Sequence, residues 1–234
     1  MHGKLYLIPS LLGNSAPGEV LPESVFRTIN RLKYYIVEDI RSARRFLIKA
    51  GSSVRIDDIT FFELNKYTEE KELNGFLLPA TSGHDTGLLS EAGIPCVADP
   101  GSKITAIAHE KGIRVVPLTG PSSIMLALMA SGLNGQSFAF HGYLPVKRDE
   151  RIKAVKKIEQ ESASRKQSQI FMETPYRNMQ MLDTLTEVCN PSTQLCIACE
   201  ITLESEFIST RSISGWKKNM PDIHKRPAIF ILQK

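Results

Sequence analysis

The sequence lacks the features that mark several large protein classes. It has no run of about eighteen apolar residues, so no segment is predicted to span a membrane. Its first predicted strand is not followed by the G-x-G-x-x-G of a dinucleotide-binding fold, and no G-x-x-x-x-G-K-[ST] or G-x-S-x-G occurs. These absences argue against a nicotinamide enzyme, a P-loop nucleotidase and a serine hydrolase.

Cysteine and histidine are also scarce, at four and five residues. Cys196 and Cys199 form a C-x-x-C, but no second Cys or His pair follows at the spacing of a zinc site, and no two histidines are four residues apart. The neighbours Leu195, Ile197 and Ile201 instead favour a buried strand, where cysteine behaves as a small apolar residue. We therefore expect reduced thiols, no metal and a cytoplasmic protein.

The remaining composition is that of an ordinary globular chain. Of the 234 residues, 42% are hydrophobic and 23% are charged, which allows one large or two small domains with real cores. The net charge of +4 permits an anionic partner but does not by itself indicate nucleic-acid binding. The N-terminal apolar run is broken by Pro9 and lacks a cleavage site, so no signal peptide is expected.

Strand-like and helix-like segments alternate along the chain, which predicts an α/β fold. Expected strands in the first half cover residues 4–8, 34–38, 85–89 and 113–118. Three helices are also expected: one that begins at Pro22, one that ends at Gly51 and one that follows Gly101. The strand-like segments of the second half are less regular and predict a mixed sheet. Those of the first half predict a mostly parallel sheet. We expect two α/β domains, residues 1–117 and 118–234.

The stretch "SEAGIPCVADPG", residues 90–101, concentrates turn formers between a strand and a helix. Such a turn lies at the carboxyl end of a sheet strand, where α/β proteins bind ligands. Gly93 and Gly101 would allow the backbone to approach a ligand closely. Asp99 could accept a hydrogen bond from a ligand or cap the next helix, and both roles remain open.

Six ordered segments, "GKLYLIP", "EDIR", "LLSEAGIPCVADPG", "VVPLTGPSS", "FHGYLP" and "ETPYR", resemble the tetrapyrrole-methylase superfamily. The branch that methylates small-subunit ribosomal RNA is the most similar. The resemblance covers nearly the whole chain. It implies S-adenosylmethionine as the cofactor, a cofactor cleft between two α/β domains, and a homodimer.

Cofactor-binding residues are also implied by this resemblance. They lie in the turns after strands and in two later strands: Pro9, Asp99, Gly101, Ser102, Ser122, Ser123, Ile124, Met172 and Ala228. "TGPSS" is equally ordinary capping chemistry for the helix that follows it.

An RNA acceptor would need a base for the ribose hydroxyl and cations for the phosphates. Glu91 and Glu173, in turns at strand ends, are the candidate bases, although either could be a structural carboxylate paired with an arginine. Two basic helices supply the candidate RNA contacts: Arg41, Arg44, Arg45, Lys153 and Lys156. Charged runs of this kind are often only solvated helix faces.

Two departures from the ribosomal RNA branch affect the predicted substrate. Phe62 to Asn65 read "FELN" where the branch has "HEHN", and "EDIR" replaces "EDTR". A methyltransferase for a tetrapyrrole or another small molecule therefore remains an alternative. A catalytically idle dimeric binding module is a third interpretation.

Overall fold

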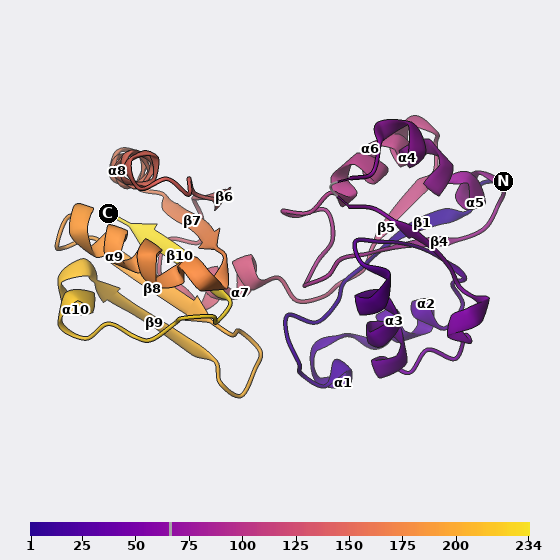
Figure 1. Ribbon diagram of the computed structural model, residues 1–234, viewed down its shortest axis with the longest axis horizontal. Helices are drawn as coiled ribbons and strands as arrows, with labels where there is room; N and C mark the ends of the chain where they lie inside the picture. The colour runs from indigo at the N-terminus through magenta and orange to yellow at the C-terminus, as the bar shows by residue number, and fades with distance from the viewer. Residues whose placement is uncertain (66) are drawn as a thin grey trace. The chain divides into compact units, whose positions relative to one another are not determined.

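The computed structural model describes residues 1–65 and 67–234. The chain forms two compact units, Met1–Ser122 and Ser123–Lys234. Each unit has its own five-stranded sheet and its own hydrophobic core (Figure 1). In the part of the chain that the structure describes, no helix is long and apolar enough to cross a membrane.

The sheet of the first unit is parallel throughout, with the strand order β3-β2-β4-β1-β5. Its strands are β1 (Lys4–Ile8), β2 (Tyr34–Val37), β3 (Thr60–Glu63), β4 (Thr86–Leu89) and β5 (Arg114–Pro117). The four residues of β4 are all buried, as is usual where helices cover both faces of a parallel sheet. The predicted parallel sheet is confirmed.

Helices cover both faces of this sheet, as Figure 1 shows. They are α1 (Pro17–Val20), α2 (Glu23–Ile29), α3 (Ile40–Lys49), α4 (Glu70–Phe76), α5 (Leu78–Thr81) and α6 (Gly101–Glu110), with a 3-10 turn η1 (Ile56–Asp58). Successive strand residues point to opposite faces, so Tyr6 and Ile8 pack with α2 and α3, whereas Leu5 packs with α4 and α6. The loops that follow the strands therefore extend from a sheet that is packed on both faces.

The second unit has a mixed sheet, as predicted, with the order β6-β7-β10-β8-β9. The strands β6 (Phe138–Tyr143) and β7 (Ser168–Glu173) are parallel, and the pairs formed by β7, β10 (Ala228–Gln233), β8 (Gln194–Cys199) and β9 (Phe207–Ser212) are antiparallel. The helices are α7 (Ser123–Ser131), α8 (Arg148–Arg165), α9 (Asn178–Val188) and α10 (Ile213–Lys218), with a 3-10 turn η2 (Pro175–Arg177).

The C-x-x-C lies in β8, so the buried-strand interpretation of this segment is confirmed. Cys196 and Cys199 are buried and unbridged, and burial raises the pKa of the Cys199 thiol to about 11. Three residues apart on a strand, their side chains leave opposite faces of the sheet.

Helix α9 begins at Asn178, because Pro175 opens a separate 3-10 turn before it. One element of the first unit was not predicted. No strand was expected at Thr60–Glu63, where the structure has the edge strand β3.

Candidate active site

Three loops meet at the carboxyl ends of β4, β1 and β5, which are neighbours in the sheet of the first unit. The backbone N–H of Ser10 donates to the carbonyl of Gly93 at 2.9 Å. A Cβ atom on Gly93 would lie 3.0 Å from the carbonyl oxygen of Pro121, and one on Gly120 would overlap the ring of Pro9. The loops therefore pack closely at these two glycines, where a side chain would be strained or would overlap a neighbour.

The loop between β4 and α6 is organised by Asp99. Its carboxylate accepts hydrogen bonds from the backbone N–H groups of Cys96, at 2.9 Å, and Gly101, at 2.8 Å. Cys96 and Ala98 adopt left-handed φ angles of 67° and 62°, which non-glycine residues adopt at an energetic cost. Burial raises the pKa of Asp99, although the two N–H groups oppose that effect. Asp99 therefore bonds the first residue of α6, although the N-cap position is Pro100, which makes no side-chain cap hydrogen bond.

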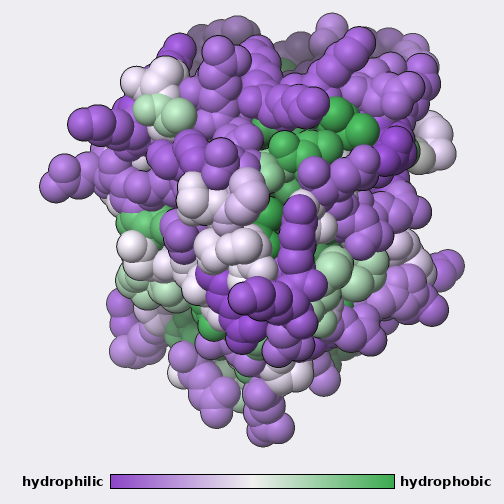
Figure 2. Space-filling model, turned by 90° about the vertical axis from the view of Figure 1, so that its left-hand side faces the viewer, coloured by the Kyte–Doolittle hydropathy of each residue, from purple (hydrophilic) through white to green (hydrophobic). Residues whose placement is uncertain are grey.

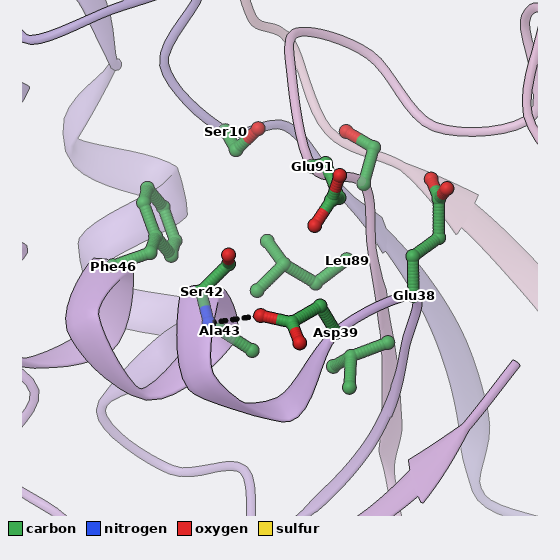
Figure 3. A pocket seen from close by; sticks show the side chains of 10 residues that line it. Ser10, Glu38, Asp39, Ser42, Ala43, Phe46, Leu89 and Glu91 are labelled. Atoms are coloured by element: carbon green, nitrogen blue, oxygen red, sulfur yellow. Dashed lines mark hydrogen bonds between the residues drawn. The ribbon is translucent and has the colours of Figure 1, made fainter. Parts of the chain in front are cut away.

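A small polar cavity lies beside these loops, at the start of α3 (Figure 3). Strand register explains it: Val37 pairs with Leu89, and Leu89 pairs with Ile8, so the residues after the three strands are neighbours. The cavity volume is about 30 Å³. Its lining combines acids and hydroxyls with an apolar wall, namely Ser10, Val37, Glu38, Asp39, Ser42, Ala43, Phe46, Leu89, Ser90 and Glu91.

The side chains of Asp39 and Ser10, which line this cavity, differ in their hydrogen bonding. Asp39 caps α3 by accepting from the backbone N–H of Ser42 at 2.7 Å. The Ser10 side chain is buried, and its Oγ atom has no hydrogen-bond partner among the described residues. A buried hydroxyl without a partner is uncommon and marks a place for a further polar group.

A second cavity, of about 460 Å³, shares Glu38, Asp39 and Glu91 with the first. Asn65, Tyr67 and Pro100 are further described residues that line it. This volume lies in the range of small-molecule sites. The pKa of Glu38 is raised, first by burial and then by the negative charges of Asp99 and Glu91. A perturbed carboxyl in a cavity at strand ends is typical of an active site.

The structure brings together the cofactor-binding residues predicted in the first unit. Pro9, Asp99, Gly101 and Ser122 all lie in or beside the three converging loops, and the exposed Ser102 is in the first turn of α6. Their assignment to the cofactor stays a prediction.

The predicted residues of the second unit also share one region. Met172 pairs with Ile229, next to Ala228 at the start of β10. Helix α7 packs on β10, and Asn134, just beyond its C-terminal end, donates its backbone N–H to Gln233 at the far end of that strand. The N-terminal residues Ser123 and Ile124 therefore lie towards the Ala228 end.

The two candidate bases have different surroundings. Glu91 is exposed and lines both cavities. Glu173 is buried, and its Oε1 atom accepts from Thr174 N at 2.6 Å and from Arg177 Nη2 at 2.6 Å. This is the arginine-paired arrangement that was the structural alternative for Glu173, whereas Glu91 has the access that a base requires.

The two basic helices differ in a similar way. On α3, Arg41, Arg44 and Arg45 are exposed, and none forms an ion pair with a carboxylate among residues 1–65 and 67–234. Arg44 lies over the Phe61 ring at 5.7 Å. The arginines of α3, which form no ion pair among the described residues, therefore lie beside the acidic cavity.

On α8 much of the charge is compensated. Arg148 pairs with Glu187 at 2.8 Å. Arg151 is buried against Thr184 and the carbonyl of Val146, so it is not available to a phosphate. Lys153 and Lys156 remain exposed. The face of the molecule shown in Figure 2 is largely hydrophilic.

Ser10, Glu38 and Asp39 were not among the site residues predicted from the sequence. The signal was present in "EDIR" directly after a strand, but their grouping depends on the β1, β2 and β4 neighbourhood. Among the described residues, no cluster of His, Cys, Asp or Glu could hold a metal ion.

Comparison with solved structures identifies the fold as that of the tetrapyrrole methyltransferases. The methyltransferase CobJ aligns over 99% of this chain and 94% of its own, with a TM-score of 0.66 and 16% identity. Uroporphyrin-III C-methyltransferase from Thermus thermophilus, solved with S-adenosylhomocysteine, aligns over 99% of this chain and 98% of its own, with a TM-score of 0.57 and 18% identity.

Comparison with curated proteins identifies the family. Ribosomal RNA small subunit methyltransferase I of Streptococcus pyogenes serotype M6 is 32% identical over 217 residues, which are 91% of this chain and 69% of the relative. The Escherichia coli O157:H7 protein of the same name is 29% identical over 235 residues, covering 99% of this chain and 78% of its own length. The chain belongs to the ribosomal RNA small subunit methyltransferase I family. No protein-family model matches it.

Proposed function

We propose that the protein transfers a methyl group from S-adenosylmethionine to RNA of the small ribosomal subunit, at a ribose 2′-hydroxyl. The observation that carries this proposal is the similarity to relatives named for that substrate, which extends over most of both chains. The cavities beside Glu91 and the unpaired cations of α3 support it from the structure.

The residues of the first unit fit this cofactor. Close-packed turns at Gly93 and Gly120 hold the three loops together, and the unpartnered Ser10 hydroxyl and nearby carboxylates can bond hydroxyl or ammonium groups. When bound, S-adenosylmethionine supplies an electrophilic methyl group on a sulfonium. Predicted contacts fall in both units, and we propose that both contribute to binding.

Glu91 is the residue that we propose as the base. A ribose hydroxyl is a weak nucleophile, and a carboxylate within hydrogen-bond reach would accept its proton as the new O–C bond forms. Glu91 is exposed and lines the larger cavity, so an acceptor group can reach it. Glu38 lies close enough to Glu91 and Asp99 for their negative charges to raise the pKa of Glu38, in addition to the effect of burial.

The decisive experiment is methyl transfer from labelled S-adenosylmethionine to small ribosomal subunits, with tetrapyrrole precursors assayed in parallel. A 2′-O-methyl group blocks alkaline cleavage of the adjacent phosphodiester, so a labelled alkali-resistant dinucleotide is the expected product. Label in the free base would indicate base methylation. Transfer to the tetrapyrrole alone would make the small-molecule alternative the function, and no transfer to either would indicate the idle binding module.

We further propose that the active form is a cytoplasmic homodimer. Light scattering on the purified protein should give twice the chain mass of 26.1 kDa, whereas a monomer mass at micromolar concentration would contradict the dimer.

A further inference from the structure

One end of the sheet in the second unit carries exposed tyrosines. Tyr143 ends β6 and pairs with Met172 of β7, while Tyr176 follows β7 in η2. Their exposed fractions are 56% and 69%. Large aromatic side chains that stay this exposed contribute little to a core, and two at the same end of one sheet call for an explanation.

Tyr176 is presented by two segments that are distant in the sequence. The backbone N–H of Lys225 donates to the carbonyl of Pro175 at 3.0 Å. The fully buried Asn178 donates from Nδ2 to the carbonyl of Arg226 at 2.6 Å. These bonds fix residues 222–226 against the start of α9, so the side chains exposed there are held on an ordered backbone.

The hydrogen bonds that fix residues 222–226 place positive charge beside the Tyr176 ring. The Lys225 Nζ atom lies 5.7 Å from the centre of the Tyr176 ring, and the His224 ring stands edge-on with its centre at 6.4 Å. Lys225 covers one face of Tyr176, and the 69% exposure of the residue leaves access to the remainder. A ring with a free face and an adjacent ammonium is suited to stacking a base while contacting its phosphate.

Among the described residues near Tyr176, the two arginines are paired with glutamates, whereas Lys225 forms no ion pair. Arg177 is held by Glu173 and interacts electrostatically with Tyr143, and Arg226 is paired with Glu200 at 2.8 Å. The exposed Asp222 keeps its negative charge in the same segment, and its Oδ1 atom accepts from the backbone N–H of His224 at 3.0 Å.

We propose that Tyr143, Tyr176, His224 and Lys225, here called the Tyr176 surface, bind an unpaired nucleotide of the RNA substrate. The base stacks on Tyr176 and a neighbouring phosphate contacts Lys225. The inference rests on the proposed RNA substrate. A single-stranded segment is specified because stacking needs a base that is free of its own helix, whereas duplex RNA offers mainly phosphates and hydroxyls.

The proposal is tested with the full-length protein and a fluorescein-labelled oligouridylate of about 12 nucleotides, a length in the range of single-strand sites. Tyr176→Ala should weaken binding by about tenfold, whereas Tyr176→Phe, which keeps the ring, should stay within about twofold of the parent. Lys225→Gln should reduce the salt dependence by about 0.7 in the slope of log K against log salt. Binding to a duplex of the same length should change little in the tyrosine variants.

Matched controls come from the opposite end of the same sheet. Phe138 is an exposed aromatic residue at the start of β6, and Lys166 is an exposed lysine with a left-handed φ, as is Lys225. Phe138→Ala and Lys166→Gln should leave oligouridylate affinity unchanged. Equal losses in the control and test variants would overturn the proposal.

Cofactor affinity separates this inference from its alternatives. Calorimetric binding of S-adenosylmethionine should be the same in Tyr176→Ala and the parent. A loss of cofactor affinity with unchanged RNA affinity would assign the ring to the cofactor and overturn the RNA assignment. If the parent protein methylates ribosomal subunits and Tyr176→Ala binds RNA as the parent does, the RNA-binding role of the Tyr176 surface is refuted. The proposed function is then still supported.

Discussion

Both carboxylate oxygens of Asp99 lie 2.9 Å from the backbone nitrogen of Cys96, three residues earlier in the chain. A single side chain thereby holds a loop in which Cys96 and Ala98 have left-handed backbones. The same carboxylate also bonds the first residue of α6, Gly101. The loop after β4 is thus fixed from within before any ligand binds, which reduces the ordering cost of binding.

Asp99→Ala should therefore weaken both the fold and the cofactor site. We expect a loss of about 1–2 kcal/mol in the free energy of unfolding, since two backbone donors lose a charged acceptor in a partly exposed setting. Asp99→Asn keeps one acceptor oxygen and should lose less. Urea denaturation and calorimetry with S-adenosylmethionine measure the two effects. Unchanged stability and affinity in Asp99→Ala would show that the loop holds its shape without this side chain.

Glu38 provides a pH-dependent prediction. Its folded-state pKa is raised above the ordinary value of 4.5 by burial, by Asp99 and by Glu91, so ionisation is less favourable in the folded state than in the unfolded state. The folded protein then loses stability as the pH rises from about 4.5 through the raised pKa. Glu38→Gln removes the ionisation and should be more stable than the parent at pH 7.

Urea denaturation across about pH 4 to pH 8 tests this sign. The advantage of Glu38→Gln should shrink as the pH falls towards the unfolded-state value. The matched control is Glu204→Gln, which removes the same charge from an exposed turn. A Glu38→Gln protein that is less stable than the parent at neutral pH would mean that the carboxylate makes net favourable contacts there.

Arg177 should be needed to keep Glu173 in its buried position. The Glu173 side chain is fully buried, and Arg177 donates to its Oε1 atom from Nε at 3.0 Å and from Nη2 at 2.6 Å. Arg177→Met leaves the carboxylate without its counter-charge and should cost about 2–3 kcal/mol in the free energy of unfolding. The double variant Arg177→Met with Glu173→Gln should recover part of that loss. Additive losses in thermal or urea unfolding would contradict a coupled pair.

Gly120 should not tolerate a side chain. A Cβ atom there would overlap the Pro9 ring and separate the loops after β1 and β5. Gly120→Ala should destabilise the protein by about 1–3 kcal/mol, as overpacking does, and should weaken cofactor binding. The control is Gly75→Ala in α4, where a Cβ atom meets nothing within 4 Å and alanine favours the helix. Equal stability of the two variants would show that the loops can separate freely.

The sequence predicted the parts of this molecule that depend on local patterns. The alternation of strands and helices gave the parallel and mixed sheets, and the acid, proline and glycine content of residues 90–101 located the turn at the site. The edge strand β3 was missed because "TFFE" is short, has no apolar alternation, and has two exposed end residues.

The grouping of the site could not be read from local patterns. Ser10, Glu38 and Glu91 meet because β4 lies between β2 and β1, an order that does not follow the chain. The opposite surroundings of Glu91 and Glu173 are also invisible in the sequence, since both lie at the end of a strand and only tertiary packing buries Glu173. Likewise, the ion pairs that distinguish α8 from α3 join distant residues, such as Arg148 and Glu187.

The unpaired cations of α3 give the last prediction, which concerns RNA binding. Arg44 and Arg45 are exposed next to the acidic cavities, so an RNA whose acceptor nucleotide enters there would place its phosphates against this helix. Arg44→Gln with Arg45→Gln should lower RNA affinity and reduce the slope of log K against log salt by about 1.4, because each single-strand phosphate that a cation neutralises adds roughly 0.7 to that slope. Lys153→Gln with Lys156→Gln should give a smaller decrease.

The control for these pairs is Arg27→Gln with Lys71→Gln, because both cations are already paired with glutamates of the first unit. This variant should keep the parent slope. Cofactor affinity should be the same in all three double variants, since none of these side chains lies in the converging loops. If the α3 and α8 variants both bind and methylate RNA as the parent does, phosphate contacts lie elsewhere. If the parent ignores RNA even at low salt, where electrostatic binding is strongest, the small-molecule methyltransferase becomes the better description.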